Sequence, residues 1–121
     1  MTDVIGQKKL SFDDSLWIKI IEGKYAENEK KRLETLQDIA EKLRNRFTDN
    51  DFSSLYIVGS ILKTGEFYDF SDIDIAVDGL RKDYFQVWAE IEEVTGRKID
   101  LIEMEKCRFK ESIKKYGLKI I

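Results

Sequence analysis

A short strand-like stretch in the middle of the chain limits the available folds more than any other segment. Polar and apolar residues alternate from Asp72 to Val77, which is the period of a β-strand. Because successive strand side chains point to opposite faces, Asp72 and Asp74 are expected on one face. Ile73, Ile75 and Val77 are expected on the other, toward a core. Aspartate is uncommon in strands and two on one face repel each other, so a purely structural strand would not favour this pair.

Three other segments have the apolar, β-rich character of strands. The first covers residues 55–58 and is closed by Gly59-Ser60. The others cover residues 98–103 and 118–121. Asp100 lies inside the second of these otherwise apolar segments, so it repeats the anomaly of an aspartate within a strand.

Helices are predicted before the first strand. Ser11 followed by Asp14 resembles a capping box, which predicts a short helix that ends near Gly23. The next helix has the clearest apolar periodicity. Its apolar face consists of Leu33, Leu36, Ala40, Leu43 and Phe47. Charged residues such as Glu29 fill the other faces of this helix and are interpreted as solvated.

Two further helices are predicted in the second half of the chain. Residues 81–95 have helical spacing, and Gly96 is suited to cap them. Residues 106–116 form the last helix, which Gly117 ends. The apolar side of this last helix consists of Phe109, Ile113 and Tyr116.

This order of elements predicts an α+β domain, in which a small mixed β-sheet is flanked by helices and preceded by N-terminal helices. The length of 121 residues favours a single domain. Residues 1–50 would be a helical N-terminal extension and residues 52–121 the catalytic core. Trp17 and Trp88 are expected to pack in the core rather than on a partner surface.

The chemistry open to the chain is narrowed by its lack of histidine. Ser-His-Asp and Cys-His catalysis and histidine-based zinc sites are excluded, so carboxylates, hydroxyls, lysines or arginines must carry any reaction. Cys107 is the only cysteine and is interpreted as a structural thiol. A single cysteine forms no internal disulfide, which fits a reducing cytoplasm.

Charge and hydropathy restrict the partners. Lys and Arg number 21 against 24 Asp and Glu, a formal charge of −3, so general nucleic-acid binding is not expected. No run approaches the roughly 18 apolar residues of a membrane span, and the N-terminus lacks an apolar export signal. We therefore expect a cytoplasmic protein with no membrane contact.

The aspartates predict a metal site. If the strand over 98–103 lies beside the strand over 72–77, Asp72, Asp74 and Asp100 converge. Carboxylate oxygens without histidine or cysteine ligands indicate Mg²⁺ or Mn²⁺. Such ions can stabilise the attacking and leaving oxygens of a phosphoryl displacement.

The residues after the first strand are suited to bind the phosphate groups that such a metal site would act on. Gly59 at a strand end lets the backbone approach a ligand closely. The Ser60 hydroxyl and nearby N–H groups can donate to phosphate oxygens, and Lys63 can add positive charge. A Gly-Ser pair alone is usually an ordinary turn, and an Asp-x-Asp pair alone often marks a surface turn. Their combination with a third aspartate in a later strand is much more specific.

The same residues resemble a known family. The segments 57–60 and 71–77 look like the signature of the DNA polymerase β-type nucleotidyltransferases, and 96–102 resembles the third-carboxylate strand of their minimal members. The resemblance covers roughly residues 52–121. It is strongest to the minimal nucleotidyltransferases that act as antitoxins beside HEPN-domain toxins.

This resemblance implies a polymerase β-like fold and the transfer of AMP from ATP to a tyrosine of a partner HEPN ribonuclease toxin, in a hetero-oligomer. By the family pattern, Asp72 and Asp74 would hold both metal ions. Asp100 would complete the catalytic metal's ligands and help to deprotonate the acceptor hydroxyl. Gly59 and Ser60 would hold the nucleotide phosphates, with Lys63 beside them.

Two alternatives remain open. The enzyme could instead act on a small molecule, since small-molecule nucleotidyltransferases share this core, or on an RNA end, since that reaction needs little protein. The chain could also neutralise a toxin by binding alone, although a pure binder has no need of mutually repelling aspartates.

Overall fold

The computed structural model of the chain describes residues 12–65 and 71–121. Three α-helices, α1 to α3, cover Phe12–Arg46, Tyr84–Thr95 and Lys110–Tyr116. Four strands, β1 to β4, cover Ser54–Val58, Ile73–Asp78, Ile99–Glu103 and Leu118–Lys119. Two short 3₁₀ helices, η1 and η2, cover Ser60–Leu62 and Met104–Lys106.

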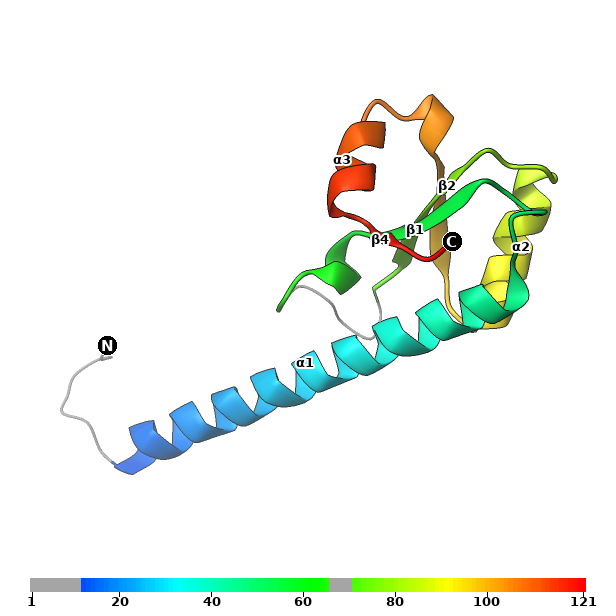
Figure 1. Ribbon diagram of the computed structural model, residues 1–121. Coiled ribbons are helices and arrows are strands. Elements are labelled where there is room, and N and C mark those ends of the chain that lie inside the picture. The colour runs from blue at the N-terminus through cyan, green and yellow to red at the C-terminus, as the bar shows by residue number, and fades with distance from the viewer. Residues whose placement is uncertain (1–11, 66–70) are drawn as a thin grey trace.

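The strands form one mixed sheet in the order β3-β2-β1-β4. β1 pairs with β2 and β4 in antiparallel fashion, and β2 pairs with β3 in parallel. Parallel neighbours need a crossover connection, which α2 supplies between β2 and β3. Figure 1 shows helices on both sides of this sheet. The predicted α+β class with a small mixed sheet is therefore confirmed.

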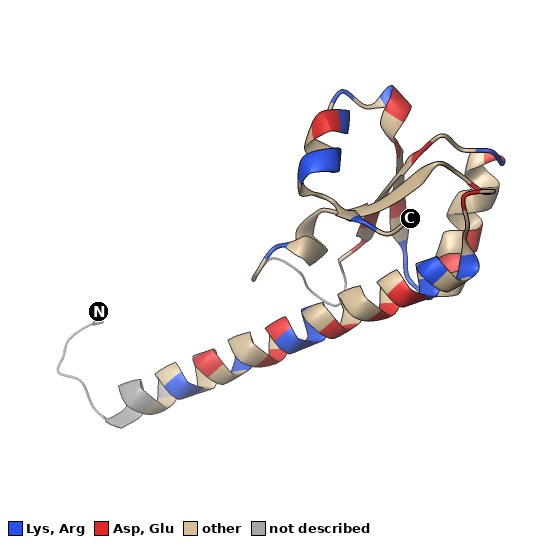
Figure 2. Ribbon diagram, in the orientation of Figure 1, with Lys and Arg blue, Asp and Glu red and all other residues tan. Residues whose placement is uncertain are grey.

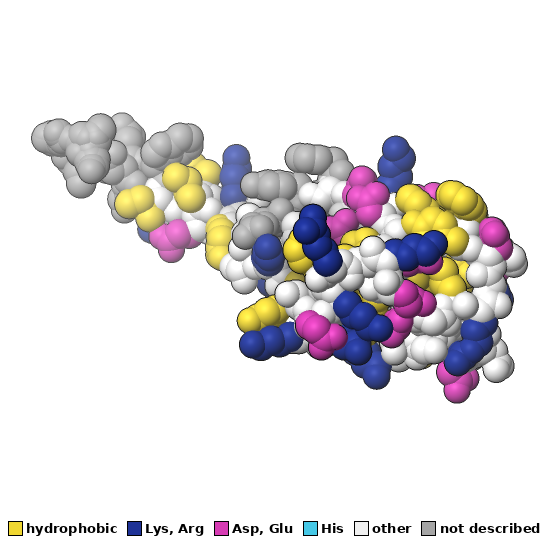
Figure 3. Space-filling model, turned by 90° about the horizontal axis from the view of Figure 1, so that it is seen from above, with side chains coloured by type: hydrophobic (Ala, Val, Ile, Leu, Met, Phe, Trp, Pro, Cys, Tyr) yellow, Lys and Arg dark blue, Asp and Glu magenta, His cyan; other side chains and the backbone are white. Residues whose placement is uncertain are grey.

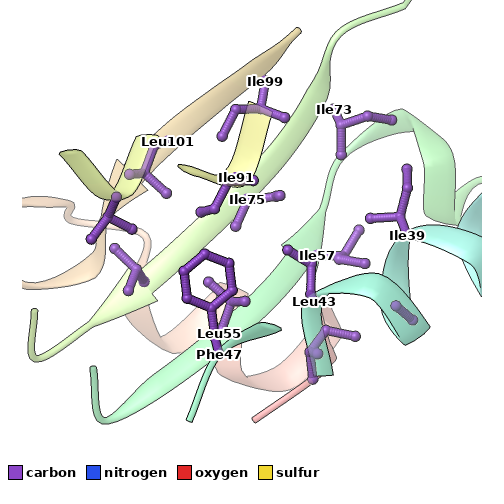
Figure 4. Close-up of a cluster of buried hydrophobic side chains, with 14 of the residues drawn as sticks. Ile39, Leu43, Phe47, Leu55, Ile57, Ile73, Ile75, Ile91, Ile99 and Leu101 are labelled. Atoms are coloured by element: carbon purple, nitrogen blue, oxygen red, sulfur yellow. The ribbon is translucent and has the colours of Figure 1, made fainter. Parts of the chain in front are cut away.

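Each face of the sheet has its own apolar cluster. Ile73, Ile75 and Val77 pack with residues of α1 and α2, as their period-two spacing predicted. Figure 4 shows this larger cluster, in which side chains from α1, α2 and three strands meet. On the opposite face, Tyr56 and Ala76 pack against η2 and α3. The helices thus cover both faces of the sheet.

The N-terminal helix differs from its prediction. We predicted a short helix that ends near Gly23, but α1 runs without interruption from Phe12 to Arg46. Glycine inside a helix costs only about 1 kcal/mol relative to alanine, so it does not end a helix that good helix formers continue on both sides. The expected cap Ser11 lies outside the described residues.

Only the C-terminal part of α1 covers the sheet. Leu33 was predicted in its apolar face but is 54% exposed, whereas Arg32 beside it is only 8% exposed. The buried stripe also includes Ile39, which the prediction omitted. The face was therefore misassigned by one residue at its N-terminal end, because that end meets the loop after β1 rather than the apolar core.

The first half of α1 projects from the rest of the domain (Figure 1). Large apolar side chains are exposed along it, as Figure 3 also shows near the N-terminal end. They are Leu16, Ile18, Ile20, Ile21 and Tyr25. None of the helices within residues 12–65 and 71–121 is long and apolar enough to cross a bilayer.

The remaining helices follow their predictions in part. α2 ends at Gly96, which has the left-handed conformation of a C-cap, with φ of 68°. Trp88 is half-buried against the larger cluster, and the Trp17 side chain lies outside the described residues. α3 is shorter than predicted, and although Ile113 is buried, Phe109 and Tyr116 are exposed. A helix of two turns presents only a narrow face to the sheet.

Candidate active site

Register places two of the predicted aspartates side by side. Asp74 of β2 pairs with Asp100 of β3, and on its other side with Val58 of β1. Asp74 and Asp100 alternate with residues of the larger cluster, so they project from the α3 face of the sheet. Figure 2 shows acidic positions on these two neighbouring strands. Asp72, which is exposed, directly precedes β2.

The electrostatics of Asp74 reflect this crowding. Burial raises the pKa of its carboxyl above the ordinary 3.8, and the negative charges of Asp100 and Asp72 raise it further. A hydrogen bond between the Asp74 and Asp100 side chains acts in the same direction. Negative charge gathered in this way favours either a shared proton or a bound cation.

Gly59 fits closely against Asp74. Its backbone has φ of 85° and ψ of −156°, a conformation that almost only glycine adopts. A Cβ atom placed there would lie 2.2 Å from Oδ2 of Asp74. The carboxylate of Asp74 thus occupies the space that a side chain at position 59 would need, and the approach of a ligand to this glycine stays a prediction.

The residues after Gly59 form a tight turn beside the aspartates. η1 starts at Ser60, and the Lys63 N–H donates to the Ser60 carbonyl at 3.0 Å. Ile61 is buried, which anchors the turn, while the Lys63 side chain is exposed. Gly59 therefore adjoins Asp74, Ser60 follows it at the start of the turn, and Lys63 lies at the outer end of the same turn.

A cleft of about 460 Å³ adjoins this turn on the α3 side. It is lined by Val58, Gly59, Leu62, Lys63, Ser112, Ile113, Tyr116 and Gly117. Its volume lies within the range of small-ligand sites, which are mostly apolar with a few polar groups. Gly59 lines the cleft and also lies against the Asp74 carboxylate, so the cleft and the aspartate cluster meet at this glycine.

The donor chemistry of the cluster fits a hard divalent cation. Among residues 12–65 and 71–121, however, no three acidic or cysteine side chains are arranged to hold a metal as they stand. Mg²⁺ commonly binds through one or two carboxylates and completes its shell with water and substrate phosphate oxygens. The Asp74–Asp100 pair meets that requirement, and Asp72 would complete it only with a side-chain rearrangement.

Two residues of α1 contact the turn after Gly59, and neither was identified from the sequence. Glu29 and Arg32 form an ion pair at 3.1 Å and bond to the backbone of Ile61 and Gly65. Their signal is visible in retrospect, because Arg32 continues the buried stripe of Leu36 and is spaced three residues from Glu29. The interpretation of Glu29 as a solvated residue was therefore wrong.

Comparison with known proteins agrees with the geometry. The family model described as polymerase beta, nucleotidyltransferase matches residues 25–121. The match begins within α1 and includes the sheet, both later helices and the aspartate cluster. None of the curated proteins that were compared matches the chain.

Proposed function

Because this chain belongs to the polymerase beta nucleotidyltransferase family, we propose that it transfers AMP from ATP to a tyrosine of a HEPN-type ribonuclease toxin and thereby acts as its antitoxin. Family membership supports the nucleotidyltransferase reaction itself. The acceptor, the nucleotide and the antitoxin role rest on the resemblance of residues 52–121 to minimal nucleotidyltransferases. The observation that carries the proposal is the in-register pair Asp74–Asp100, with Gly59 packed against Asp74.

The proposed reaction is an in-line displacement at phosphorus. The acceptor hydroxyl oxygen forms a bond to the α-phosphorus of ATP, the bond from that phosphorus to the bridging oxygen breaks, and pyrophosphate leaves. Bound Mg²⁺ or Mn²⁺ would supply electrostatic stabilisation of the phosphate charge. Asp72 and Asp74 would hold the metal, and Asp100 would also receive the proton of the acceptor hydroxyl. Asp100 is exposed, so a bulky acceptor can reach it from solvent.

The nucleotide would bind along the turn after β1. Ser60 and backbone N–H groups near Gly59 would donate to the phosphates, and Lys63 would balance their charge. The cleft beside Gly59 provides room for further parts of the nucleotide or for the acceptor. In this proposal, the phosphates would lie between the turn and the aspartates, where the displacement would occur.

The test is transfer of a labelled nucleotide. The chain would be incubated with a HEPN-type partner, Mg²⁺ and each labelled nucleoside triphosphate, and mass spectrometry would locate any product. Asp74→Asn should abolish transfer. Asp78→Asn is a matched control, because Asp78 ends the same strand and its side chain pairs with Lys110 at 3.6 Å.

AMP on a partner tyrosine with the wild type and Asp78→Asn, but not with Asp74→Asn, would support the proposal. Transfer to a small molecule or an RNA end instead would contradict the protein acceptor. Toxin neutralisation that persists in Asp74→Asn cells would contradict the need for catalysis and favour binding alone.

A further inference from the structure

Arg32 is a buried cation on a helix whose other described arginines are exposed. Its Nη1 donates to the carbonyl oxygen of Ile61 at 2.9 Å. Its Nε and Nη2 donate to the carboxylate of Glu29, one turn earlier, at 3.1–3.2 Å. The guanidinium therefore connects α1 to the first half of the turn that follows Gly59.

Glu29 connects α1 to the other end of that turn. Its Oε2 accepts a hydrogen bond from the Gly65 N–H at 3.0 Å. Hydrogen bonds from Arg32, Gly65 and Thr64 hold the pKa of the Glu29 carboxyl below its ordinary 4.5. These bonds favour the ionised form, so at neutral pH the carboxylate stays charged and keeps its partners.

The two residues thus hold a short loop, residues 60–65, near both of its ends. Ser60 and Lys63, the proposed phosphate contacts, lie within this loop, and Lys63 lies between the two attachment points. Figure 1 shows η1 and the chain after it above α1. A loop held in this way has lost its conformational freedom before a ligand arrives, which lowers the entropic cost of binding.

The stability of the fold alone does not explain why Glu29 and Arg32 form an ion pair here. Burying the Arg32 guanidinium costs desolvation even with Glu29 as its partner, and a well-packed apolar residue at such a position is often as stabilising. Arg32 continues a stripe that contains Leu36, Ile39 and Leu43, where an apolar side chain would avoid that cost. A specific requirement for the loop conformation explains the pair better than packing does.

We propose that Glu29 and Arg32 are positioning residues that preset the loop over 60–65 for the nucleotide phosphates. The inference rests on the proposed nucleotidyltransferase function. It assigns part of the site to α1, which contributes no residue to the aspartate cluster.

The first variant to test is Glu29→Gln. Glutamine keeps the shape but offers a single acceptor oxygen, so either Arg32 or the Gly65 N–H loses its partner. Asp38→Asn is the matched control, since Asp38 pairs with Lys42 on the same helix at 2.9 Å and is exposed. Hydrogen exchange of the Gly65 amide should become about tenfold faster in Glu29→Gln and stay unchanged in Asp38→Asn.

The second measurement is equilibrium binding of ATP with Mg²⁺ to the full chain. Glu29→Gln should weaken the affinity about tenfold, whereas Asp38→Asn should not. A double-mutant cycle with Lys63→Ala separates positioning from general destabilisation. If the pair acts through the loop, Glu29→Gln should weaken binding much less in the Lys63→Ala background than in the wild type.

Two results would overturn the inference while the proposed function stands. One is wild-type ATP affinity in folded Glu29→Gln, and the other is an equal loss of affinity in both backgrounds. A wild-type chain that binds no nucleoside triphosphate would instead refute the proposed function and this role together, and hydrogen exchange would then report only a structural contact.

Discussion

Gly59 and Asp74 depend on each other at the level of single residues. The absence of a side chain at position 59 makes room for the Asp74 carboxylate, and the positive φ there would strain any other residue. A strand that ends in glycine therefore does more than turn the chain, because it lets a charged group of the next strand lie half-buried beside it. Substitutions of glycine by alanine should separate the steric effect of an added side chain from the strain of a positive φ.

Gly59→Ala should destabilise the fold more than Gly96→Ala does. Both glycines have positive φ, but a Cβ at Gly96 meets nothing within 4 Å, whereas at Gly59 it would overlap the Asp74 carboxylate. Gly96→Ala should cost about 1–2 kcal/mol from the left-handed backbone alone. Urea unfolding would compare the variants, and equal losses would show that the Asp74 carboxylate moves aside freely.

Asp74→Asn should stabilise the metal-free protein while it removes activity. Burial first, and then repulsion from Asp100 and Asp72, raises the Asp74 pKa, and the variant removes the charge that these effects disfavour. A gain of about 0.5–1 kcal/mol is expected, the size of a cross-strand side-chain effect. Unfolding would be measured with and without Mg²⁺, since Mg²⁺ should stabilise the wild type more than the variant. A metal-free variant less stable than the wild type would contradict this view of the cluster.

Sequence reasoning found the carboxylates because their chemistry is unusual for strands. Asp74 and Asp100 interrupt apolar segments, and the parallel pairing of their strands then follows from one crossover helix. The same reasoning missed Arg32 and Glu29, because charged residues are common on helices and give no sign of a special role. Only the position of the loop after β1, a tertiary contact, buries Arg32 and gives Glu29 its loop partner. The contact of Gly59 with Asp74 could not be predicted either, because it too is a tertiary contact.

At the level of elements, α1 divides into two parts with different roles. Its C-terminal part packs on the sheet through Ile39 and Leu43, whereas its first half projects from the domain. The apolar periodicity of the sequence predicted that this segment is helical. It could not show at which residue the helix begins to contact the sheet. Leu33 was misassigned because it follows the apolar spacing yet lies on the exposed side of the helix.

Two matched leucines on this helix test that division. Leu43→Ala should destabilise the protein by about 2–5 kcal/mol, because Leu43 has no exposed surface and its removal leaves a cavity. Leu33→Ala should change stability by no more than about 0.5 kcal/mol, the usual range for surface sites. Chemical denaturation of both variants would decide the matter, and similar losses would mean that Leu33 is buried against something in solution.

At the level of the whole molecule, an ion-pair network ties distant segments together. Lys82, just before α2, contacts Asp51 at 2.6 Å and Glu90 at 3.5 Å, and Glu90 also pairs with Arg46 at the end of α1. Asp51 further accepts a hydrogen bond from the Thr48 N–H at 2.9 Å. None of these residues belongs to the aspartate cluster or to the turn after Gly59, so the network can be altered without changing a group of the proposed reaction.

The network should give the fold a defined pH dependence. The hydrogen bond from Lys82 holds the Asp51 pKa below its ordinary 3.8, so the stability that Asp51 contributes is present above 3.8 and is lost as pH falls through the folded pKa. The Lys82 pKa is raised above 10.5 chiefly by the same hydrogen bond, so its contribution is present below 10.5 and is lost as pH rises through the folded value.

Asp51→Asn should therefore be less stable than the wild type at neutral pH, by about 1 kcal/mol, the net value of a typical hydrogen bond. The difference between the two proteins should shrink below pH 3.8, as Asp51 of the wild type becomes protonated, and again above pH 10.5, as Lys82 loses its proton. Urea unfolding across this pH range would measure it, with Asp38→Asn as a control whose exposed ion pair contributes little. A difference that stays constant from neutral to acidic pH would show that Asp51 stabilises the fold through shape and not through its charge.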